Sequence, residues 1–219
     1  RPIVSGAVSE TQAFIFASAL TIISLLIFSI FTTLWATVLT AAAIIFYVFG
    51  YTIGLKRRTS QNIVWGGIAG CLPVLIGWAA VTNSLSWTAL WFFMVIFFWT
   101  PPHFWALAID RMEDYKKADI PMLPVTHGVA FTKFQIILYT VILILVSLLP
   151  FIVLMSGIFY LISASILGAI FLYYSIKLYR DHGRGSDGKV TIFGYNSRLD
   201  NIQAAILLQK FKYYEDAIE

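Results

Sequence analysis

Long runs of apolar residues alternate with short polar segments along the first 180 positions of the chain. Each run is close to the roughly 20 residues that a helix needs to cross the hydrocarbon core of a bilayer. Because the runs are continuous, they predict helices and not the alternating strands of a membrane β-barrel. Six spans are predicted: Thr11–Phe31, Leu34–Ile53, Ile63–Val81, Trp87–Ile109, Phe134–Met155 and Ile158–Tyr179.

The composition agrees with this pattern. Apolar residues make up 59% of the 219 positions and charged residues 12%, with a mean hydropathy of +0.82. Soluble domains average roughly 45–50% apolar residues and about 25% charged residues. A soluble enzyme and a disulfide scaffold are therefore excluded, and the single cysteine, Cys71, allows no intrachain disulfide. Very short links between some spans indicate antiparallel neighbours. The predicted fold class is an all-α, polytopic transmembrane helix bundle.

The few charges of this region lie in alternate connections. Three groups of cations follow the second, fourth and sixth spans, whereas the connections after the first, third and fifth spans carry no charge. By the positive-inside rule the charged connections face the cytoplasm. This confinement to loops also argues against a nucleic-acid partner, although the net charge is +4. Apart from Lys133, which directly precedes the fifth span, the cations of these connections are Lys56, Arg57, Arg58, Arg111, Lys116, Lys117, Lys177 and Arg180.

The connection after the fourth span is the densest polar segment. If the helix continued past Asp110, that residue and Asp114 would share one face, with Glu113 beside them and Asp119 able to fold back. Carboxylates at the mouth of a bundle suit Mg²⁺ holding a diphosphate, and the metal would help the diphosphate leave. The alternative is a solvated interfacial loop that only sets topology, and the spacing does not separate the two.

Two other features have a functional and a structural interpretation. The cluster Lys56–Arg58 could bind diphosphate oxygens, or it could act only as a topogenic signal, which composition favours. His103, about two turns inside from Asp110, could contact haem, transfer a proton, or hydrogen-bond a carbonyl freed by the neighbouring prolines. Gly66, Gly67 and Gly70 indicate close helix packing more than ligand binding.

Three stretches resemble the protoheme IX farnesyltransferases (haem O synthases) of the UbiA prenyltransferase superfamily. They are residues 51–67, which contain Leu-Lys-Arg-Arg-Thr-Ser-Gln-Asn; residues 99–109, with Pro-Pro-His-Phe-Trp; and residues 114–125, with Ile-Pro-Met-Leu-Pro. The last two motifs distinguish this branch from other members of the superfamily. The resemblance covers about Arg1 to Arg180.

The resemblance implies a nine-helix bundle with two Asp-rich cytoplasmic motifs around a central cavity. Asp110, Glu113 and Asp114 match the second motif, and Arg1-Pro2 resembles the end of the segment that follows the first. We therefore expect about six of nine helices here, with the first motif outside this chain. The family also implies the bacterial cytoplasmic (inner) membrane as location, multi-pass, with the acidic loop on the cytoplasmic side.

The implied reaction transfers a farnesyl group from farnesyl diphosphate to the vinyl group of haem B, giving haem O. Haem B is then a substrate, Mg²⁺ the expected cofactor, and a downstream haem A synthase a possible partner. We expect Asp114, Asp110 and Glu113 to be catalytic, and Asp110, Asp114 and Asp119 to bind the metal. The diphosphate would be bound by Lys56, Arg57, Arg58, Lys116 and Lys117. His103 would lie on the haem side.

Residues 180–219 differ from the rest of the chain. They are polar and glycine-rich, and Ser197–Asp200 is a capping-box pattern that predicts a helix. Parts of this tail resemble pyridoxal-phosphate nucleotide-sugar aminotransferases, an unrelated soluble fold. We therefore divide the chain into a partial UbiA-like transmembrane region, 1–179, and a tail, 180–219, that is foreign or chimeric.

Two other functions stay open. One is a UbiA-type enzyme that prenylates an aromatic quinone precursor. The other is a non-catalytic membrane transporter, against which stands the lack of Asp, Glu, Lys and Arg in the middle of all six spans.

Overall fold

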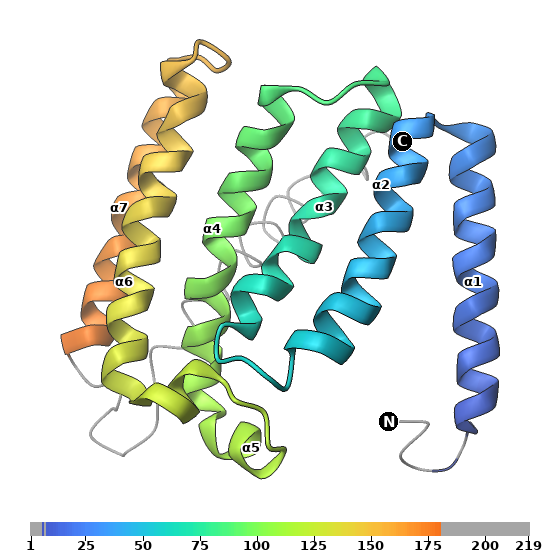
Figure 1. Ribbon diagram of the computed structural model, residues 1–219. Coiled ribbons are helices and arrows are strands. Elements are labelled where there is room, and N and C mark those ends of the chain that lie inside the picture. The colour runs from blue at the N-terminus through green and yellow to red at the C-terminus, as the bar shows by residue number, and fades with distance from the viewer. Residues whose placement is uncertain (1–5, 7, 181–219) are drawn as a thin grey trace, which may run out of the picture.

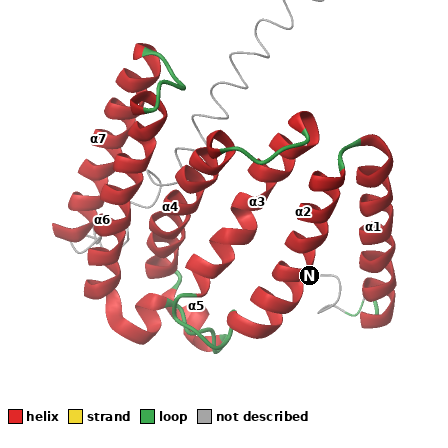
Figure 2. Cartoon of the chain, turned by 45° about the horizontal axis from the view of Figure 1, so that its top comes forward, coloured by secondary structure: helices red, strands yellow, loops and turns green. Residues whose placement is uncertain are grey.

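The computed structural model describes residue 6 and residues 8–180, and this part of the chain consists of helices joined by short connections (Figure 2). Six helices are long and apolar enough to cross a membrane, which confirms the six predicted spans and makes this a multi-pass membrane protein. The helices are α1 (Glu10–Phe31), α2 (Leu34–Ile45), the π-helix η1 (Phe46–Leu55), α3 (Asn62–Thr82), α4 (Trp87–Asp110), α5 (Met112–Lys117), α6 (Leu123–Ile152) and α7 (Ile158–Arg180).

The long helices stand side by side in chain order, with α1 at one edge and the α6–α7 pair at the other (Figure 1). α4 is central and packs against both α3 and α6. α1 packs against α2, and none of its residues is buried by the rest of the described chain. The bundle is therefore a row of helices whose middle, at α3, α4 and α6, holds most of the buried residues.

Side-chain caps define the turns at the uncharged end of the bundle. The Thr33 hydroxyl accepts a hydrogen bond from the backbone of Ala36 and donates one to the carbonyl of Ala79, 2.7 Å away on α3. Ser86 caps α4 by accepting from the backbone of Ala89 at 3.3 Å. Such caps satisfy orphan backbone donors at helix starts, so these short connections hold their helices as antiparallel neighbours.

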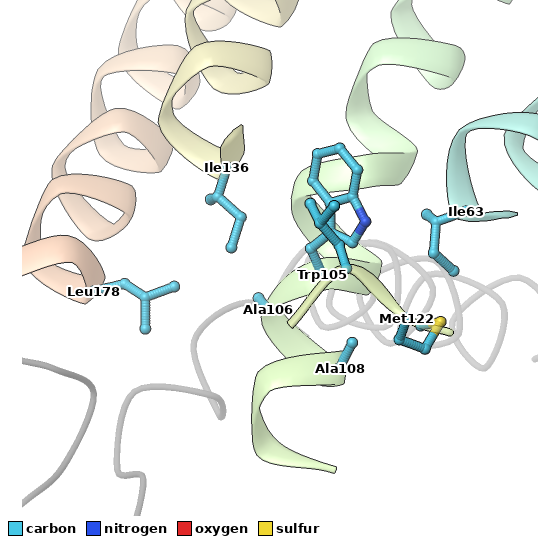
Figure 3. Close-up of a cluster of buried hydrophobic side chains, with 8 residues drawn as sticks. Ile63, Trp105, Ala106, Ala108, Met122, Ile136 and Leu178 are labelled. Carbon is cyan, nitrogen blue, oxygen red and sulfur yellow. The ribbon is translucent and has the colours of Figure 1, made fainter. Parts of the chain in front are cut away.

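The largest apolar cluster lies toward the charged end of the bundle. Trp105 of α4 is completely buried, and Figure 3 shows it between Ile136 of α6 and Ile63 of α3. Its ring meets that of Tyr139 edge to face, with centroids 5.1 Å apart. Leu178 brings α7 into the same cluster. Burial of such a large side chain between α3 and α6 fixes α4 relative to the charged connections that follow it.

The charged connections share one end of the bundle, as the alternation along the sequence predicts. The η1–α3 connection, α5 and the last turn of α7 lie at one end, and the α1–α2, α3–α4 and α6–α7 connections lie at the other (Figure 1). Which end faces the cytoplasm stays a prediction.

Three local features differ from the sequence predictions. The fifth span begins at Leu123 and not at Phe134, with a break at Gly128, whose φ of 82° favours glycine. The second span ends in ten residues of π-helix. The fourth helix does not continue through Asp114: it ends at Asp110, and α5 begins after Arg111. The predicted domain boundary at 179/180 and the tail lie at and beyond the limit of the described residues, and stay predictions.

Candidate functional site

The acidic connection is built on the short helix α5. Arg111 leaves the helical conformation at φ −100°, ψ 24°, and its carbonyl then accepts hydrogen bonds from the backbone of Asp114 and Tyr115, both at 3.1 Å. Glu113 and Asp114 are thereby placed in the first turn of α5, where negative charge is favourable. This break, which the spacing alone did not reveal, ends the common helical face predicted for Asp110 and Asp114.

The four carboxylates of this connection are exposed and are not gathered. Asp110 ends α4, Glu113 and Asp114 begin α5, and Asp119 takes the left-handed conformation (φ 54°) that turns the chain toward α6. Among residues 6 and 8–180 no group of three or more His, Cys, Asp or Glu side chains could hold a metal ion. The predicted set Asp110, Asp114 and Asp119 is therefore one connection, but not a preformed metal cage.

Tyr115 fixes this connection to the core of the bundle. Its half-buried ring packs against the cluster that contains Trp105 and Ile63. The two acidic residues before it and Lys116 and Lys117 after it are exposed. The charges of α5 are therefore presented at the surface by an anchored helix.

The basic connection is held by a residue that the sequence reasoning missed. The Nδ2 of Asn62 donates a hydrogen bond to the carbonyl of Lys56 at 3.1 Å, and Asn62 is only 1% exposed. Arg57 and Arg58 are exposed, and Lys56 is half-buried. The Oδ1 of Asn62 is buried without a hydrogen-bond partner. Asn62 lies inside the stretch 51–67, so the motif contained the residue, but its burial was not visible from the pattern.

The π-helix η1 brings an aromatic side chain next to this connection. The backbone of Lys56 donates to the carbonyl of Tyr51, five residues earlier, at 2.8 Å. A Cβ at Gly66 would lie 2.9 Å from the Tyr51 ring. Glycine at position 66 therefore lets the Tyr51 ring lie directly against α3, which supports the packing role predicted for it. π-Helices are rare and often occur at functional sites.

A cavity of about 650 Å³ lies between α2–η1, α3 and α4. This volume is within the range of small-molecule sites, roughly 300–1,000 Å³. Aliphatic and aromatic side chains and glycines form most of its wall. The lining residues are Ala43, Ile44, Tyr47, Val48, Tyr51, Ile63, Gly66, Gly67, Ala69, Gly70, Ile96, Trp99, Thr100 and Phe104.

The cavity has one end near the charged connections. Tyr51 and Ile63 flank the basic connection in the chain, and Phe104 adjoins Trp105 of the core cluster. A second cavity, of about 690 Å³, lies between α4, α6 and α7, and shares Ile96 and Trp99 with the first. These two side chains of α4 therefore separate two hollows of the bundle.

His103 lies beside the wall of the first cavity. Its ring stacks on Trp99 with centroids 4.5 Å apart and meets the Phe104 ring edge to face at 5.2 Å. Both neighbours line the cavity. Its assignment to the haem side stays a prediction. Lys133 of α6, only 4% exposed, is a further buried polar residue that the span predictions left out, because they placed it just before the fifth span.

The structure thus brings the basic and acidic connections to one end of the bundle, next to an aromatic cavity. The UbiA prenyltransferase family model matches residues 1–197. Protoheme IX farnesyltransferase 2 of Pseudoalteromonas atlantica is 52% identical over 178 residues, covering 81% of this chain and 58% of that protein. The protoheme IX farnesyltransferase of Stenotrophomonas maltophilia is 53% identical over 182 residues, 81% of this chain and 61% of its own length.

The protoheme IX farnesyltransferase of Thioalkalivibrio sulfidiphilus is 51% identical over 180 residues, which are 82% of this chain and 60% of that protein. This chain thus spans about three fifths of the length of these curated relatives. No solved structure matches it. The extent of the family match and the identity to these relatives show that the chain belongs to the UbiA prenyltransferase family.

Proposed function

We propose that this chain is part of an enzyme that transfers a farnesyl group from farnesyl diphosphate to the vinyl group of haem B, giving haem O. Its relatives are named protoheme IX farnesyltransferases, and they match it over about four fifths of its length. The observation that carries the proposal is the aromatic cavity that adjoins a cluster of three cations. Such a site has the two chemistries that a prenyl diphosphate needs, an apolar groove and a cationic end.

The basic connection binds the diphosphate. Lys56, Arg57 and Arg58 supply ammonium and guanidinium donors, and the guanidinium groups can bind phosphate oxygens in pairs. The hydrogen bond from Asn62 holds the backbone of Lys56 in place, so part of the ordering entropy is lost before the ligand arrives. Lys116 and Lys117, in the last turn of α5, add positive charge at the same end of the bundle.

The acidic connection fits Mg²⁺ only together with the substrate. Mg²⁺ is commonly bound by one or two carboxylates, water and substrate phosphates rather than by an all-protein cage. The exposed carboxylates of Asp110 and Asp114 suit that mode, with Glu113 and Asp119 nearby in the chain. Binding of this kind needs no group of three metal-binding side chains, and the described part of the chain has none. An ion held there would neutralise charge on the departing diphosphate.

The transfer breaks the allylic C–O bond, whose electron pair leaves with the diphosphate. The π electrons of the vinyl group form the new C–C bond to the farnesyl group, and the positive charge left on the other vinyl carbon is quenched by water, which releases a proton. Apolar walls exclude other water from the allylic cation. The face of α4 that carries Trp99 and His103 is where we place the haem. The charged end of the bundle is then the cytoplasmic end, in a bacterial inner membrane.

A product analysis tests this function. Membranes that contain the complete enzyme of which this chain is part are incubated with farnesyl diphosphate and either haem B or 4-hydroxybenzoate, and the extracts are analysed by mass spectrometry. We expect haem O from the first mixture and no prenylated benzoate from the second. A prenylated benzoate without haem O would replace the proposal by the quinone-precursor reaction, and no prenylated product in either mixture would contradict prenyl transfer by an enzyme that contains this chain.

A further inference from the structure

Three glycines of α3 line the first cavity, but only two of them are explained by packing. A Cβ at Gly66 would lie 2.9 Å from the Tyr51 ring, and one at Gly67 would lie 3.3 Å from Cγ2 of Thr100. At Gly70, in contrast, which is exposed, an added Cβ would meet no atom of the described residues within 4 Å. The helix would tolerate a larger residue at Gly70, since glycine is unfavourable inside helices, and the effect of the glycine is to leave the cavity open there.

Gly70 lies at the end of the cavity remote from the basic connection. Along α3 the cavity wall runs from Ile63, next to that connection, to Gly70, which is about 10 Å at the rise of an α-helix. Ala43 is the lining residue of α2 farthest in the chain from the basic connection, and Ile96 is the lining residue of α4 farthest from the charged end. Two small residues and one isoleucine therefore form the remote end.

We propose that Gly70, together with Ala43, sets the length of the isoprenoid chain that the cavity accepts, with Ile96 as its end wall. This inference rests on the proposed function, which places the diphosphate at Lys56–Arg58. An isoprenoid held by its diphosphate there extends into the apolar cavity with its last unit toward Gly70. A side chain at position 70 would occupy part of the space for that last unit, because Gly70 lines the cavity and no atom of the described residues lies within 4 Å of the added Cβ.

The test measures competition for binding and not catalysis. The purified protein in lipid nanodiscs is loaded with radiolabelled farnesyl diphosphate, and unlabelled geranyl, farnesyl or geranylgeranyl diphosphate displaces it. Gly70→Leu adds a side chain nearly as large as one isoprene unit. We expect it to weaken the binding of farnesyl diphosphate, relative to the binding of geranyl diphosphate, by about tenfold or more, as for other over-filled apolar pockets.

Two further variants make the test specific. Gly77→Leu is the matched control: it is also in α3, its Cβ would also meet no atom within 4 Å, and it does not line the cavity. It should keep the wild-type preference. Ile96→Ala opens the end wall toward the second cavity. It should therefore strengthen the binding of geranylgeranyl diphosphate relative to that of farnesyl diphosphate. This second variant keeps the inference testable if Gly70→Leu lowers the yield of folded protein.

The outcomes separate the inference from the proposed function. If the wild type binds farnesyl diphosphate, inorganic diphosphate competes with it, and neither Gly70→Leu nor Ile96→Ala changes the chain-length preference, the inference is overturned while diphosphate binding stands. The inference is also overturned if Gly70→Leu and Gly77→Leu change the chain-length preference equally. If the wild type retains no farnesyl diphosphate, the proposed function and this inference fall together.

Discussion

Asn62 connects the basic residues to the body of the bundle through one hydrogen bond. The donor Nδ2 is satisfied by the carbonyl of Lys56, whereas the buried Oδ1 has no hydrogen-bond partner. A buried acceptor without a partner costs free energy. The side chain therefore contributes little net stability, and its effect is to fix the position of the Lys56 backbone. This separation of positioning from stability leads to the first prediction.

Asn62→Ala should weaken binding of inorganic diphosphate while changing stability little. It removes the hydrogen bond to Lys56 but also removes the unsatisfied Oδ1, so the net loss of unfolding free energy should be about 1 kcal/mol. Asn62→Leu, which has a similar volume but no Nδ2 donor and no charge, should weaken the binding of diphosphate in the same way. Equilibrium binding of labelled diphosphate and thermal unfolding in detergent measure the two effects. Unchanged diphosphate affinity in both variants would contradict a positioning role.

In the complete enzyme, Asp114→Asn should remove most prenyl transfer while the protein still inserts in the membrane. An amide keeps the shape of the carboxylate but not the charge that a metal–diphosphate complex requires. A loss of about 3 kcal/mol of transition-state stabilisation corresponds to roughly a hundredfold in rate. Haem O formation in membranes, normalised to the amount of inserted protein, measures the change.

Glu10→Gln is a matched control for this prediction. Glu10 begins α1, carries the same charge and is exposed, but is separate from the acidic connection. Its replacement should leave the rate unchanged. A fully active Asp114→Asn protein would remove Asp114 from the mechanism.

At the scale of elements, hydrophobicity predicts the ends of most helices closely. The third predicted span, Ile63–Val81, differs from α3 by one residue at each end, and the first predicted span begins one residue after α1. The reason is physical: each helix ends where the apolar run meets a polar cap or charge, such as Asn83 after α3. The same interruption of apolar runs by charges predicted which connections share one end.

The start of α6 shows where this reasoning fails. The first turns of α6 contain Pro124, Thr132 and Lys133, all of them buried by the surrounding protein. A hydropathy pattern detects contact with lipid, so it misses a helical segment that buries polar residues against other helices. For the same reason Asn62 was missed at the site. The π-helix was missed because an apolar run does not reveal its turn geometry.

The close contact between Gly66 and Tyr51 gives a prediction at this scale. Gly66→Ala places a Cβ within 2.9 Å of the Tyr51 ring and should force the ring or η1 to move, with a loss of about 1–3 kcal/mol. Gly70→Ala in the same helix meets no atom within 4 Å and should keep or slightly raise stability. Thermal unfolding in detergent compares the two. Equal unfolding temperatures would show that α3 and η1 are not in the contact described.

A double variant checks the cause. If the clash with the ring is responsible, the Gly66→Ala substitution should cost much less stability in a protein that already carries Tyr51→Ala, because the two residues are coupled by direct contact. If the full cost persists without the ring, the destabilisation has another origin in α3.

For the whole molecule, the sequence predicted which connections share one end of the bundle, but not how the candidate site is arranged within it. The alternation of charged and uncharged connections placed residues 56–58 and 110–119 at one end of the bundle, as the structure has them (Figure 1). The pattern did not reveal that Arg111 interrupts the helix between Asp110 and Asp114, since this depends on backbone conformation at one residue. The arrangement of the carboxylates therefore follows from local backbone conformation, whereas the end of the bundle on which they lie follows from topology.

The last prediction concerns topology, because the proposed diphosphate site must face the cytoplasm. Lys and Arg are retained on the cytoplasmic side during insertion, so cysteines introduced at Ser60 and Ala118 should react with a membrane-impermeant maleimide only after the membrane is opened. A cysteine at Ser84, exposed in the α3–α4 connection at the opposite end, should react in intact cells. The native Cys71 is completely buried, so it should give little background. If Ser60→Cys or Ala118→Cys is labelled in intact cells while Ser84→Cys is protected, the bundle is inverted, and the basic connection would meet no diphosphate from the cytoplasm.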